Sequence, residues 1–382
     1  MNKIAFIDGI TPVYKAGFLT SALYVFFFTL LFVSRLNQSF ITIGSIGLLL
    51  GGIITHIHLY VKLYNNRLYK SFWHYYIFII LLICANFILI HNFEFKALLH
   101  GIIILPALAL LIYFFDYKTW VCLLPFSCVS LLVIYKWFIL GLGPEEVTVN
   151  SRNYIVFFLF LYVMPYSLHC YRQNKLPSLF LPLFILVIAI LAIGRASIIM
   201  AVLFLVGWLF MLLKQTRYKV LVWIIIISIV SCTIHFGFVS DNFEVLFSRF
   251  EEKGFESSSR TDAWIQYLQY TFSSLYNILF GTKTMSVPLV KSLNGSLHNS
   301  LLTSHAYMGI FFIYYIYLAM KGYLYFFKKR DFFMLAFFGS LLIKAFVDAD
   351  FPCTAVGGDI YVCILILIGL NYRDSKYKIV SK

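Results

Sequence analysis

Long apolar stretches recur along almost the whole of this 382-residue chain. A helix needs about 20 mostly apolar residues to cross a hydrocarbon core ~30 Å thick. The sequence therefore predicts an all-α, polytopic transmembrane helical bundle of about twelve spans, built as a single integral membrane domain over residues 1–382. The predicted spans are 16–33, 40–61, 72–90, 97–115, 119–140, 154–170, 179–193, 196–213, 220–239, 300–320, 332–347 and 356–370.

The composition excludes an ordinary water-soluble fold. Hydrophobic residues make up 62% of the positions and charged residues 12%, whereas soluble domains carry about 25% charged residues. So little polar surface cannot cover so much apolar bulk. The first stretch, near 16–33, lacks a small-residue cleavage site and is followed at once by others, so no removable signal peptide is expected. The seven cysteines have no paired spacing and predict neither a disulfide framework nor a zinc site.

The net charge of +14 is distributed unevenly between alternate loops. With a cytoplasmic N-terminus, twelve spans place both termini on the cytoplasmic side. The inner segments then carry nineteen basic residues and four acids, and the outer segments carry ten basic residues and twelve acids. This asymmetry follows the positive-inside rule. The positive charge is therefore a topology signal, and it does not require nucleic acid as a partner.

The stretch from Leu179 to Leu213 is apolar for 35 residues except at Gly194 and Arg195. One straight helix of that length would measure about 52 Å at 1.5 Å per residue, which is too long for the bilayer. Basic loops flank both ends of the stretch, and both loops belong on the inner side. The chain is therefore expected to cross outward and return, with Arg195 at the outer turn. A snorkelling arginine at a helix end is the alternative reading of this residue.

One long outer loop, residues 240–299, separates the ninth and tenth spans and holds six of the sixteen acids. Loops of this length in compact folds are usually functional or disordered. The serines at 257–259 offer a helix N-terminal cap. From there, apolar residues at helical spacing predict an amphipathic helix that ends at Gly281 and lies on the membrane or on the outer face of the bundle. The residues of this stripe are Trp264, Leu268, Phe272, Leu275 and Leu279.

The predicted outer face offers several permanently charged or titratable side chains: Arg195, Arg249, Arg260 and His298, with Asp262 two residues after Arg260. Guanidinium groups bind phosphate oxygens in a bidentate fork. Arginines at the membrane surface would suit a diphosphate whose lipid tail stays in the bilayer. The alternative is a solvated loop in which the glutamates at 251, 252 and 256 neutralise the arginines.

His298 and Asn299 stand just before a predicted span, and His305 follows seven residues later on the same helix face. A histidine at this position could act as a general base, because its reference pKa is near neutrality. The alternative is a polar residue at a helix end. Asp348 and Asp350 resemble a metal-binding pair, but neither a histidine nor a third carboxylate accompanies them, so no metal site and no cofactor are predicted. Scattered polar residues inside the spans, including Asn86, predict hydrogen bonds between helices.

The order of several short motifs resembles the O-antigen polymerase and ligase superfamily of bacterial envelopes. The resemblance covers about residues 190–312. Members resemble this chain in an arginine at an outer turn, a Ser-Arg-x-x-x-Trp motif, a glycine-ended turn, and His-Asn before a span. The corresponding segments here are Gly194–Ser197, Ser259–Trp264, Asn277–Gly281 and His298–Asn299, with Gly309 in the next span. Gly194, Ala196 and Ile278 depart from the serine, glycine and proline that are usual in the family.

The resemblance implies an inverting, metal-independent glycosyltransferase at the outer face of a bacterial inner membrane. Its donor would be a glycan on undecaprenyl diphosphate, and a chain-length regulator and a flippase would be partners. Arg195 and Arg260 would hold the diphosphate, with help from Arg249. His298 would orient or deprotonate the acceptor hydroxyl, while Asp262, Asn299 and His305 would line the substrate site.

We expect a Wzy-type polymerase that joins lipid-linked repeat units into O-antigen or capsular polysaccharide. An O-antigen ligase, which transfers the glycan to lipid A–core, shares the same residues and is the nearest alternative. A polytopic transporter or flippase is the alternative from another class. Such proteins show inverted repeats and broken helices around a midplane site, whereas the candidate groups here gather on one face.

Overall fold

The structure is a computed structural model of the chain. It describes residues 14–33, 38–92, 99–143, 146–147, 152–173, 175, 177–192, 194–215, 258–348 and 358–380. The described residues are almost entirely helical. Their one sheet is a two-residue parallel pairing of β1 (Tyr14–Lys15) with β2 (Phe115–Asp116).

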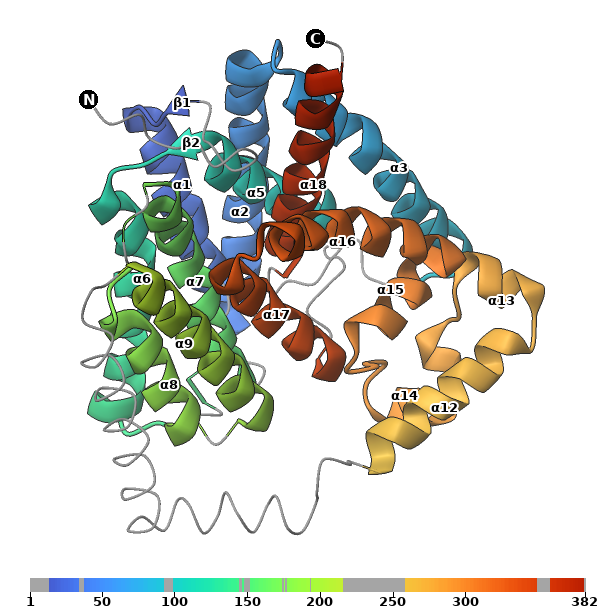
Figure 1. Ribbon diagram of the computed structural model, residues 1–382. Helices are drawn as coiled ribbons and strands as arrows, with labels where there is room; N and C mark the ends of the chain where they lie inside the picture. The colour runs from blue at the N-terminus through green and yellow to red at the C-terminus, as the bar shows by residue number, and fades with distance from the viewer. Residues whose placement is uncertain are drawn as a thin grey trace.

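The first half of the chain folds into long apolar helices (Figure 1). Two of them include a short π-helical stretch: η1 (His100–Ile104) leads into α5, and η2 (Tyr135–Ile139) continues α6. The α-helices of this half are α1 (Phe18–Val33), α2 (Gln38–Leu63), α3 (Arg67–Leu89), α5 (Leu105–Phe114), α6 (Thr119–Ile134), α7 (Arg152–Arg172), α8 (Phe180–Leu191) and α9 (Arg195–Gln215).

The second half begins with short helices and ends with three long ones. The short elements are α12 (Ser258–Phe272), α13 (Leu275–Phe280), the 3₁₀ turn η3 (Thr284–Ser286), α14 (Pro288–Ser292) and α15 (Ser300–Met308). A second 3₁₀ turn, η4 (Gly309–Phe311), leads into α16 (Phe312–Lys329), which is followed by α17 (Phe332–Val347) and α18 (Gly358–Val380). In Figure 1, β1, β2 and the C-terminal end of α18 lie at the top, and α12 to α14 lie at the lower right.

The predicted all-α architecture is confirmed. Helical structure covers every predicted span except 220–239, which lies outside the described residues. Six stretches in the described part are long and apolar enough to cross a membrane, and five further apolar helices are shorter. These are the helices of a membrane protein, while the number of twelve crossings stays a prediction.

The predicted break near Arg195 is confirmed. α8 ends at Leu191 and α9 begins at Arg195, so the long apolar stretch forms two helices that pack against each other. The Trp208 indole of α9 donates to the Pro177 carbonyl, just before α8, over 2.8 Å. The C-terminal half of α9 therefore returns to the level at which α8 starts, as a helical hairpin requires.

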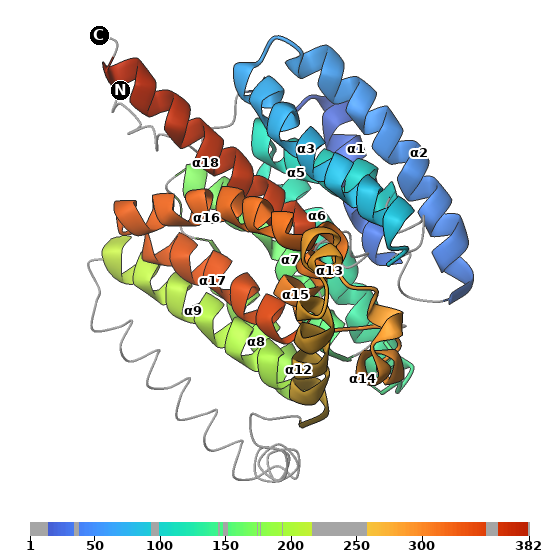
Figure 2. The same cartoon turned by 90° about the vertical axis from the view of Figure 1, so that its right-hand side faces the viewer.

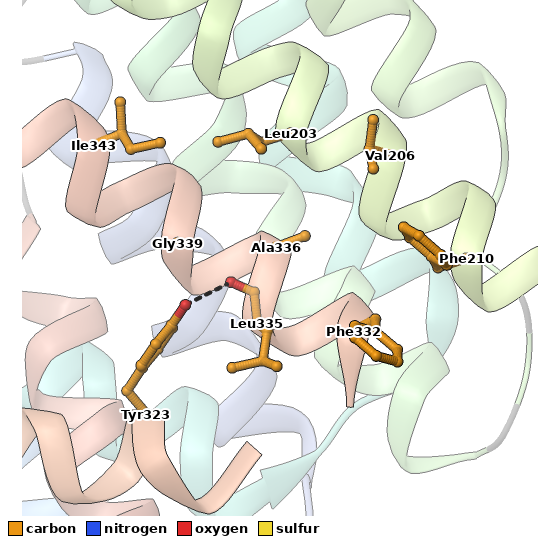
Figure 3. A pocket seen from close by; sticks show the side chains of 9 residues that line it. All are labelled: Leu203, Val206, Phe210, Tyr323, Phe332, Leu335, Ala336, Gly339 and Ile343. Carbon is orange, nitrogen blue, oxygen red and sulfur yellow. Dashed lines mark hydrogen bonds between the residues drawn. The ribbon is translucent and has the colours of Figure 1, made fainter. Parts of the chain in front are cut away.

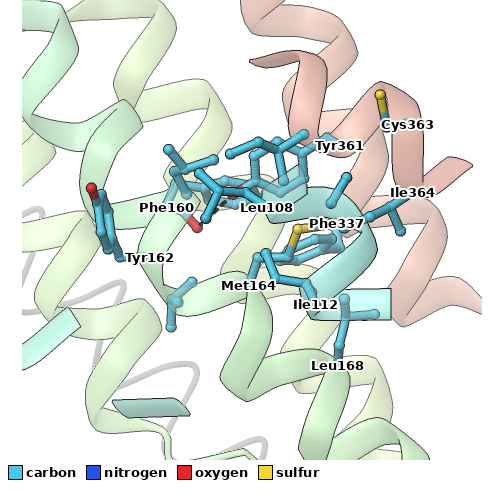
Figure 4. Close-up of a cluster of buried hydrophobic side chains, with 14 of the residues drawn as sticks. Leu108, Ile112, Phe160, Tyr162, Met164, Leu168, Phe337, Tyr361, Cys363 and Ile364 are labelled. Atoms are coloured by element: carbon cyan, nitrogen blue, oxygen red, sulfur yellow. Dashed lines mark hydrogen bonds between the residues drawn. The ribbon is translucent and has the colours of Figure 1, made fainter. Parts of the chain in front are cut away.

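The core of the bundle is built around α7. In its candidate span, Tyr154–Arg172, 89% of the residues are buried, against 28–50% in the other five. A helix that is apolar on all sides belongs inside a bundle, and α7 is such a helix. Figure 4 shows side chains of α5, α7, α17 and α18 meeting there. The Phe160 ring of α7 stacks on Phe337 of α17 with 4.9 Å between centroids, so α7 fixes the place of α17.

The α12–α14 segment (residues 258–299) has a small core of its own. The buried residues of that core are Ala263, Tyr267, Val287, Val290, Leu297 and Ala306, the last of which belongs to α15. Asn86 near the end of α3 donates to the carbonyls of Phe280 and Ala306, over 2.6 and 2.8 Å. The predicted role of Asn86 in joining helices is thereby confirmed, and the α12–α14 segment is tied to the bundle.

The prediction of one continuous amphipathic helix up to Gly281 was wrong in its continuity. The helix breaks after Phe272, and Ser274 then caps α13 by accepting a hydrogen bond from the Tyr276 amide. The buried face of α12 carries Ala263, Tyr267 and Thr271. Three of the five stripe residues, Leu268, Phe272 and Leu275, are exposed. The end at Gly281 is confirmed, since this residue terminates α13 with φ +98°.

Close packing of α16 on α18 depends on Gly322, and this contact generates a first prediction. A Cβ atom at Gly322 would lie 2.0 Å from the carbonyl oxygen of Leu365. Small residues allow such approaches between membrane helices. We expect Gly322→Ala to lower the free energy of unfolding by about 1–3 kcal/mol, the usual cost of overpacking. The measurement is the midpoint of thermal aggregation of the detergent-solubilised protein.

Gly339→Ala is the matched control, because Gly339 is also helical but has only the terminal hydroxyl of Tyr323 nearby, at 3.4 Å. Its midpoint should equal or exceed that of the wild type. Equal midpoints for both variants would contradict the close α16–α18 approach.

Candidate active site

Three charged or titratable side chains lie together at the C-terminal end of α17, and a fourth, Arg260, lies within range of their charge. Asp348 lies at the centre, as the residue that ends α17. Its carboxylate forms a buried ion pair with Lys344, one helical turn earlier. The Nδ1 atom of His298 lies 3.6 Å from the other carboxylate oxygen, and the positive charge of Arg260 in the first turn of α12 also acts on Asp348.

The charge state of Asp348 follows from these neighbours. Burial alone would raise the pKa of this carboxyl group. The charge of Lys344 and its hydrogen bond, the nearby His298 and the charge of Arg260 outweigh burial and lower the pKa to about 2. Asp348 is therefore a carboxylate at any physiological pH, and it presents a fixed negative charge to His298.

Lys344 is held in a fully buried position. Its exposed fraction is 0%, and its ammonium group lies 5.6 Å from the ring centroid of Tyr154 and 5.9 Å from that of Phe157, both on α7. Aromatic faces attract a cation electrostatically. The central helix of the bundle thus helps to hold the cation that keeps Asp348 ionised.

His298 is placed by the two residues that follow it. Asn299 caps α15 by accepting hydrogen bonds from the amides of Leu301 and Leu302, and its side-chain amide donates to the Phe346 carbonyl over 3.0 Å. The Ser300 hydroxyl donates to the Asp348 carbonyl over 2.9 Å. Asn299 is thus a cap and a link to α17. The start of α15 and the end of α17 are clamped together at His298.

The residue before His298 is held from the other side by α12. The Trp264 indole donates to the Leu297 carbonyl over 2.6 Å, and Leu297 is buried in the small core of the α12–α14 segment. His298 itself has a positive φ of 47°, which few residues other than glycine adopt. Its side chain is 31% exposed. The backbone of His298 is therefore held in place, while its imidazole ring is partly accessible to a ligand.

Arg260 and Trp264 are one turn apart on α12, so they point to the same side of that helix. Trp264 contacts the loop that carries His298, and the charge of Arg260 acts on Asp348. The fold thereby brings together Arg260 and His298, which are 38 residues apart in the sequence. Asp262 is exposed on the other side of α12.

His305 lies in the small core and not beside Asp348. Its Nδ1 atom is 2.8 Å from the Tyr267 hydroxyl, and its Nε2 atom is 3.3 Å from the Ile278 carbonyl oxygen. Both ring nitrogens are engaged, and the residue is buried. His305 therefore joins α12 and α13 to α15, and the exposed His298 is the better placed of the two histidines for chemistry.

The remaining candidates are described in part or not at all. The backbone of Arg195 begins α9, but its side chain lies outside the described part of the chain. Arg249 and Asp350 also lie outside it. Within the described ranges, no group of three or more His, Cys, Asp or Glu side chains could hold a metal ion.

A groove of about 340 Å³ lies between α9, α16 and α17 (Figure 3). Its lining is apolar apart from Tyr323, whose hydroxyl donates to the Leu335 carbonyl over 3.3 Å. Sites for chemistry combine an apolar lining with a few convergent polar groups. This groove lacks them among its described lining residues, so the cluster at Asp348 is the candidate active site.

Sequence reasoning overlooked Lys344 and the part played by Asp348. Asp348 was considered only with Asp350, as a metal ligand, and Lys344 was not singled out. The signal was available: a lysine four residues before an aspartate, at the end of an apolar helix, places opposite charges on one face.

The buried ion pair can be tested by a pair of substitutions. Lys344→Met leaves Asp348 buried without its main cation, and breaking such a pair costs about 3–5 kcal/mol of stability. Adding Asp348→Asn removes both charges and should restore most of the loss. The measurement is unfolding of the detergent-solubilised protein by heat. A single variant as stable as the wild type would contradict the assignment.

The pH dependence of the same cycle provides a control. Because the folded pKa of Asp348 lies at about 2, below the ordinary value, its stabilising contribution is complete above about pH 4. The contribution is lost as the pH falls through about 2. The wild type therefore keeps this contribution from neutral pH to pH 5, whereas in Lys344→Met burial raises the pKa of Asp348, so the stability gap between the two proteins should narrow as the pH falls.

Comparison with known proteins adds no assignment. No protein-family model matches the sequence, and no curated protein matches it.

Proposed function

We propose that this protein is a Wzy-type polymerase, which joins undecaprenyl-diphosphate-linked oligosaccharide repeat units into O-antigen or capsular polysaccharide. The reaction would take place at the outer face of a bacterial inner membrane. The observation that supports the proposal is that His298 lies beside the carboxylate of Asp348, with Arg260 near enough for its charge to act on the same carboxylate. A phosphate-binding cation and a general base are the two groups that metal-independent transfer from a lipid diphosphate needs.

In the proposed reaction, the acceptor hydroxyl attacks the anomeric carbon of the donor from the face opposite the diphosphate. The bond from this carbon to the diphosphate oxygen breaks, and undecaprenyl diphosphate leaves with the bonding electrons. The configuration at the anomeric carbon inverts. The proton of the hydroxyl passes to a base, and the departing diphosphate keeps its negative charge.

Arg260 is assigned to the leaving group. A guanidinium is charged at every physiological pH and matches the oxygens of a phosphate group. Arg260 lies in the first turn of α12, where helical N–H groups also favour an anion. Arg260 would hold the diphosphate and stabilise the charge that develops as it leaves. Arg195 and Arg249 are proposed to assist.

His298 is assigned to the acceptor. Its Nδ1 atom faces the ionised Asp348, which fixes the ring and would stabilise the imidazolium formed on proton uptake. The Nε2 atom would then accept the proton of the hydroxyl. Asp348 acts through His298, so it is a positioning residue in this proposal.

The charged cluster lies where α12, α15 and α17 begin or end, and not in the middle of a span. Transporters generally bind their cargo near the bilayer midplane. The position of the cluster therefore favours group transfer at a membrane surface over transport. An O-antigen ligase would use the same donor chemistry, and the polysaccharide gel described next distinguishes it from a polymerase.

The test is a gel of the surface polysaccharide made by a strain that lacks this gene and is complemented with variants. We expect core bearing a single repeat unit in the null strain and a full ladder with the wild type. Arg260→Ala and His298→Ala each remove a charged or hydrogen-bonding group worth roughly 1.5–3 kcal/mol, so polymer should fall ten- to a hundredfold or more.

Gln269→Ala is the matched control, since Gln269 is exposed on the polar face of α12. It should restore the full ladder, and immunoblots should show equal amounts of every variant. Long chains that remain on the lipid carrier in the null strain would instead assign the ligase. An unchanged ladder in all strains would refute glycan transfer.

A further inference from the structure

α12 has three faces, of which the small core explains only one. Ala263, Tyr267 and Thr271 face the core and are buried. Successive residues of a helix are rotated by about 100°, so Asp262, Gln269 and Ser273 form a second, polar face, which is exposed. The third face is apolar yet exposed, and it carries Ile265, Leu268 and Phe272.

The exposed apolar face continues onto α13. Phe272 at the end of α12 is 71% exposed, and Leu275 at the start of α13 is 70% exposed. Tyr276 is exposed as well. We call the five residues Ile265, Leu268, Phe272, Leu275 and Tyr276 the α12–α13 edge. An exposed apolar patch of this kind marks a surface that another apolar phase covers.

The α12–α13 edge adjoins the outer surface of a candidate membrane span. α13 packs against α3, and the Tyr276 hydroxyl donates to the Leu89 carbonyl at the end of α3 over 3.5 Å. Ile88 and Leu89, in the last turn of that span, are exposed. Figure 1 shows α13 beside this end of α3. The edge is thus continuous with side chains that lipid must cover.

We propose that the α12–α13 edge lies in the headgroup boundary of the bilayer, on the side where α3 ends, with lipid as its partner. Ile265, Leu268, Phe272 and Leu275 face the acyl chains there. Tyr276 keeps its ring in the apolar phase and its hydroxyl at the polar boundary, as tyrosines at membrane interfaces do. The polar face with Asp262 and Gln269 faces water. The sequence left open whether this helix covers the membrane or the bundle; its core-facing side covers the bundle and its edge covers lipid.

Anchoring the edge would fix the height of Arg260. Arg260 lies on the core-facing side of α12, less than two turns before Ile265. A helix in the headgroup layer holds this guanidinium at the depth of lipid phosphates. This consequence rests on the proposed function, because it supposes that Arg260 binds a lipid diphosphate. The position of the edge itself does not depend on the activity.

The experiment measures which phase surrounds each face. Phe272→Cys and Leu275→Cys report on the edge, and Gln269→Cys and Ser273→Cys are the matched controls on the polar face. Each variant carries a nitroxide label and is reconstituted into vesicles of phosphatidylethanolamine and phosphatidylglycerol. The labelled wild type gives the background from native cysteines. Collision rates of the label are measured with oxygen, which partitions into lipid, and with a water-soluble nickel complex.

We expect oxygen to exceed the nickel complex several-fold at positions 272 and 275, and the reverse at 269 and 273. Equal, high nickel accessibility at all four positions would place the edge in water and overturn the proposal. Low accessibility to both reagents at 272 and 275 would mean that protein covers the edge, which also overturns it. The collision pattern needs no catalysis, so the lipid position of the edge can be confirmed even if the polysaccharide ladder shows no effect. Conversely, the ladder can respond to Arg260→Ala and His298→Ala even if the edge lies in water.

Discussion

The arrangement of the candidate site depends on the buried ion pair between Lys344 and Asp348. Burial of an ammonium group without a partner would be prohibitively costly. The Asp348 carboxylate is therefore required beside Lys344, and this pairing fixes the end of α17. The clamp of Asn299 and Ser300 onto Phe346 and Asp348 then fixes the start of α15. His298 is placed as a result, because it directly precedes that clamp.

The α12–α14 segment contributes the second half of the site by packing rather than by charge. Its small core holds α12 against α15, and the hydrogen bond from Trp264 to Leu297 fixes the loop before His298. Arg260 is brought near Asp348 because it shares the side of α12 that carries Trp264. In this arrangement, the proposed diphosphate-binding group and the proposed base are supported by different elements, so substitutions can separate their roles.

The helices were predictable because each apolar run is a local property of the sequence. The break before Arg195 followed from the length of the apolar stretch and from the basic loops at both of its ends, and the end of α13 followed from Gly281. The contacts of the site were not predictable in this way. Asp348 and His298 are 50 residues apart, and no local sequence pattern around either residue predicts a contact with the other. The side of α12 that meets protein was not predictable, because two of its three faces carry apolar residues and periodicity cannot tell which of them meets protein.

The most direct test of the account uses the purified protein and a synthetic undecaprenyl-diphosphate-linked repeat unit, with a chelator present. The account predicts lipid-linked oligomers, one undecaprenyl diphosphate released for each new bond, and an inverted anomeric configuration in the product. Replacement of Asp348 by Glu should retain more activity than replacement by Asn, because the negative charge beside His298 is kept. Absence of any glycosidic bond formation by a folded, lipid-reconstituted protein, or retention of the anomeric configuration, would contradict it.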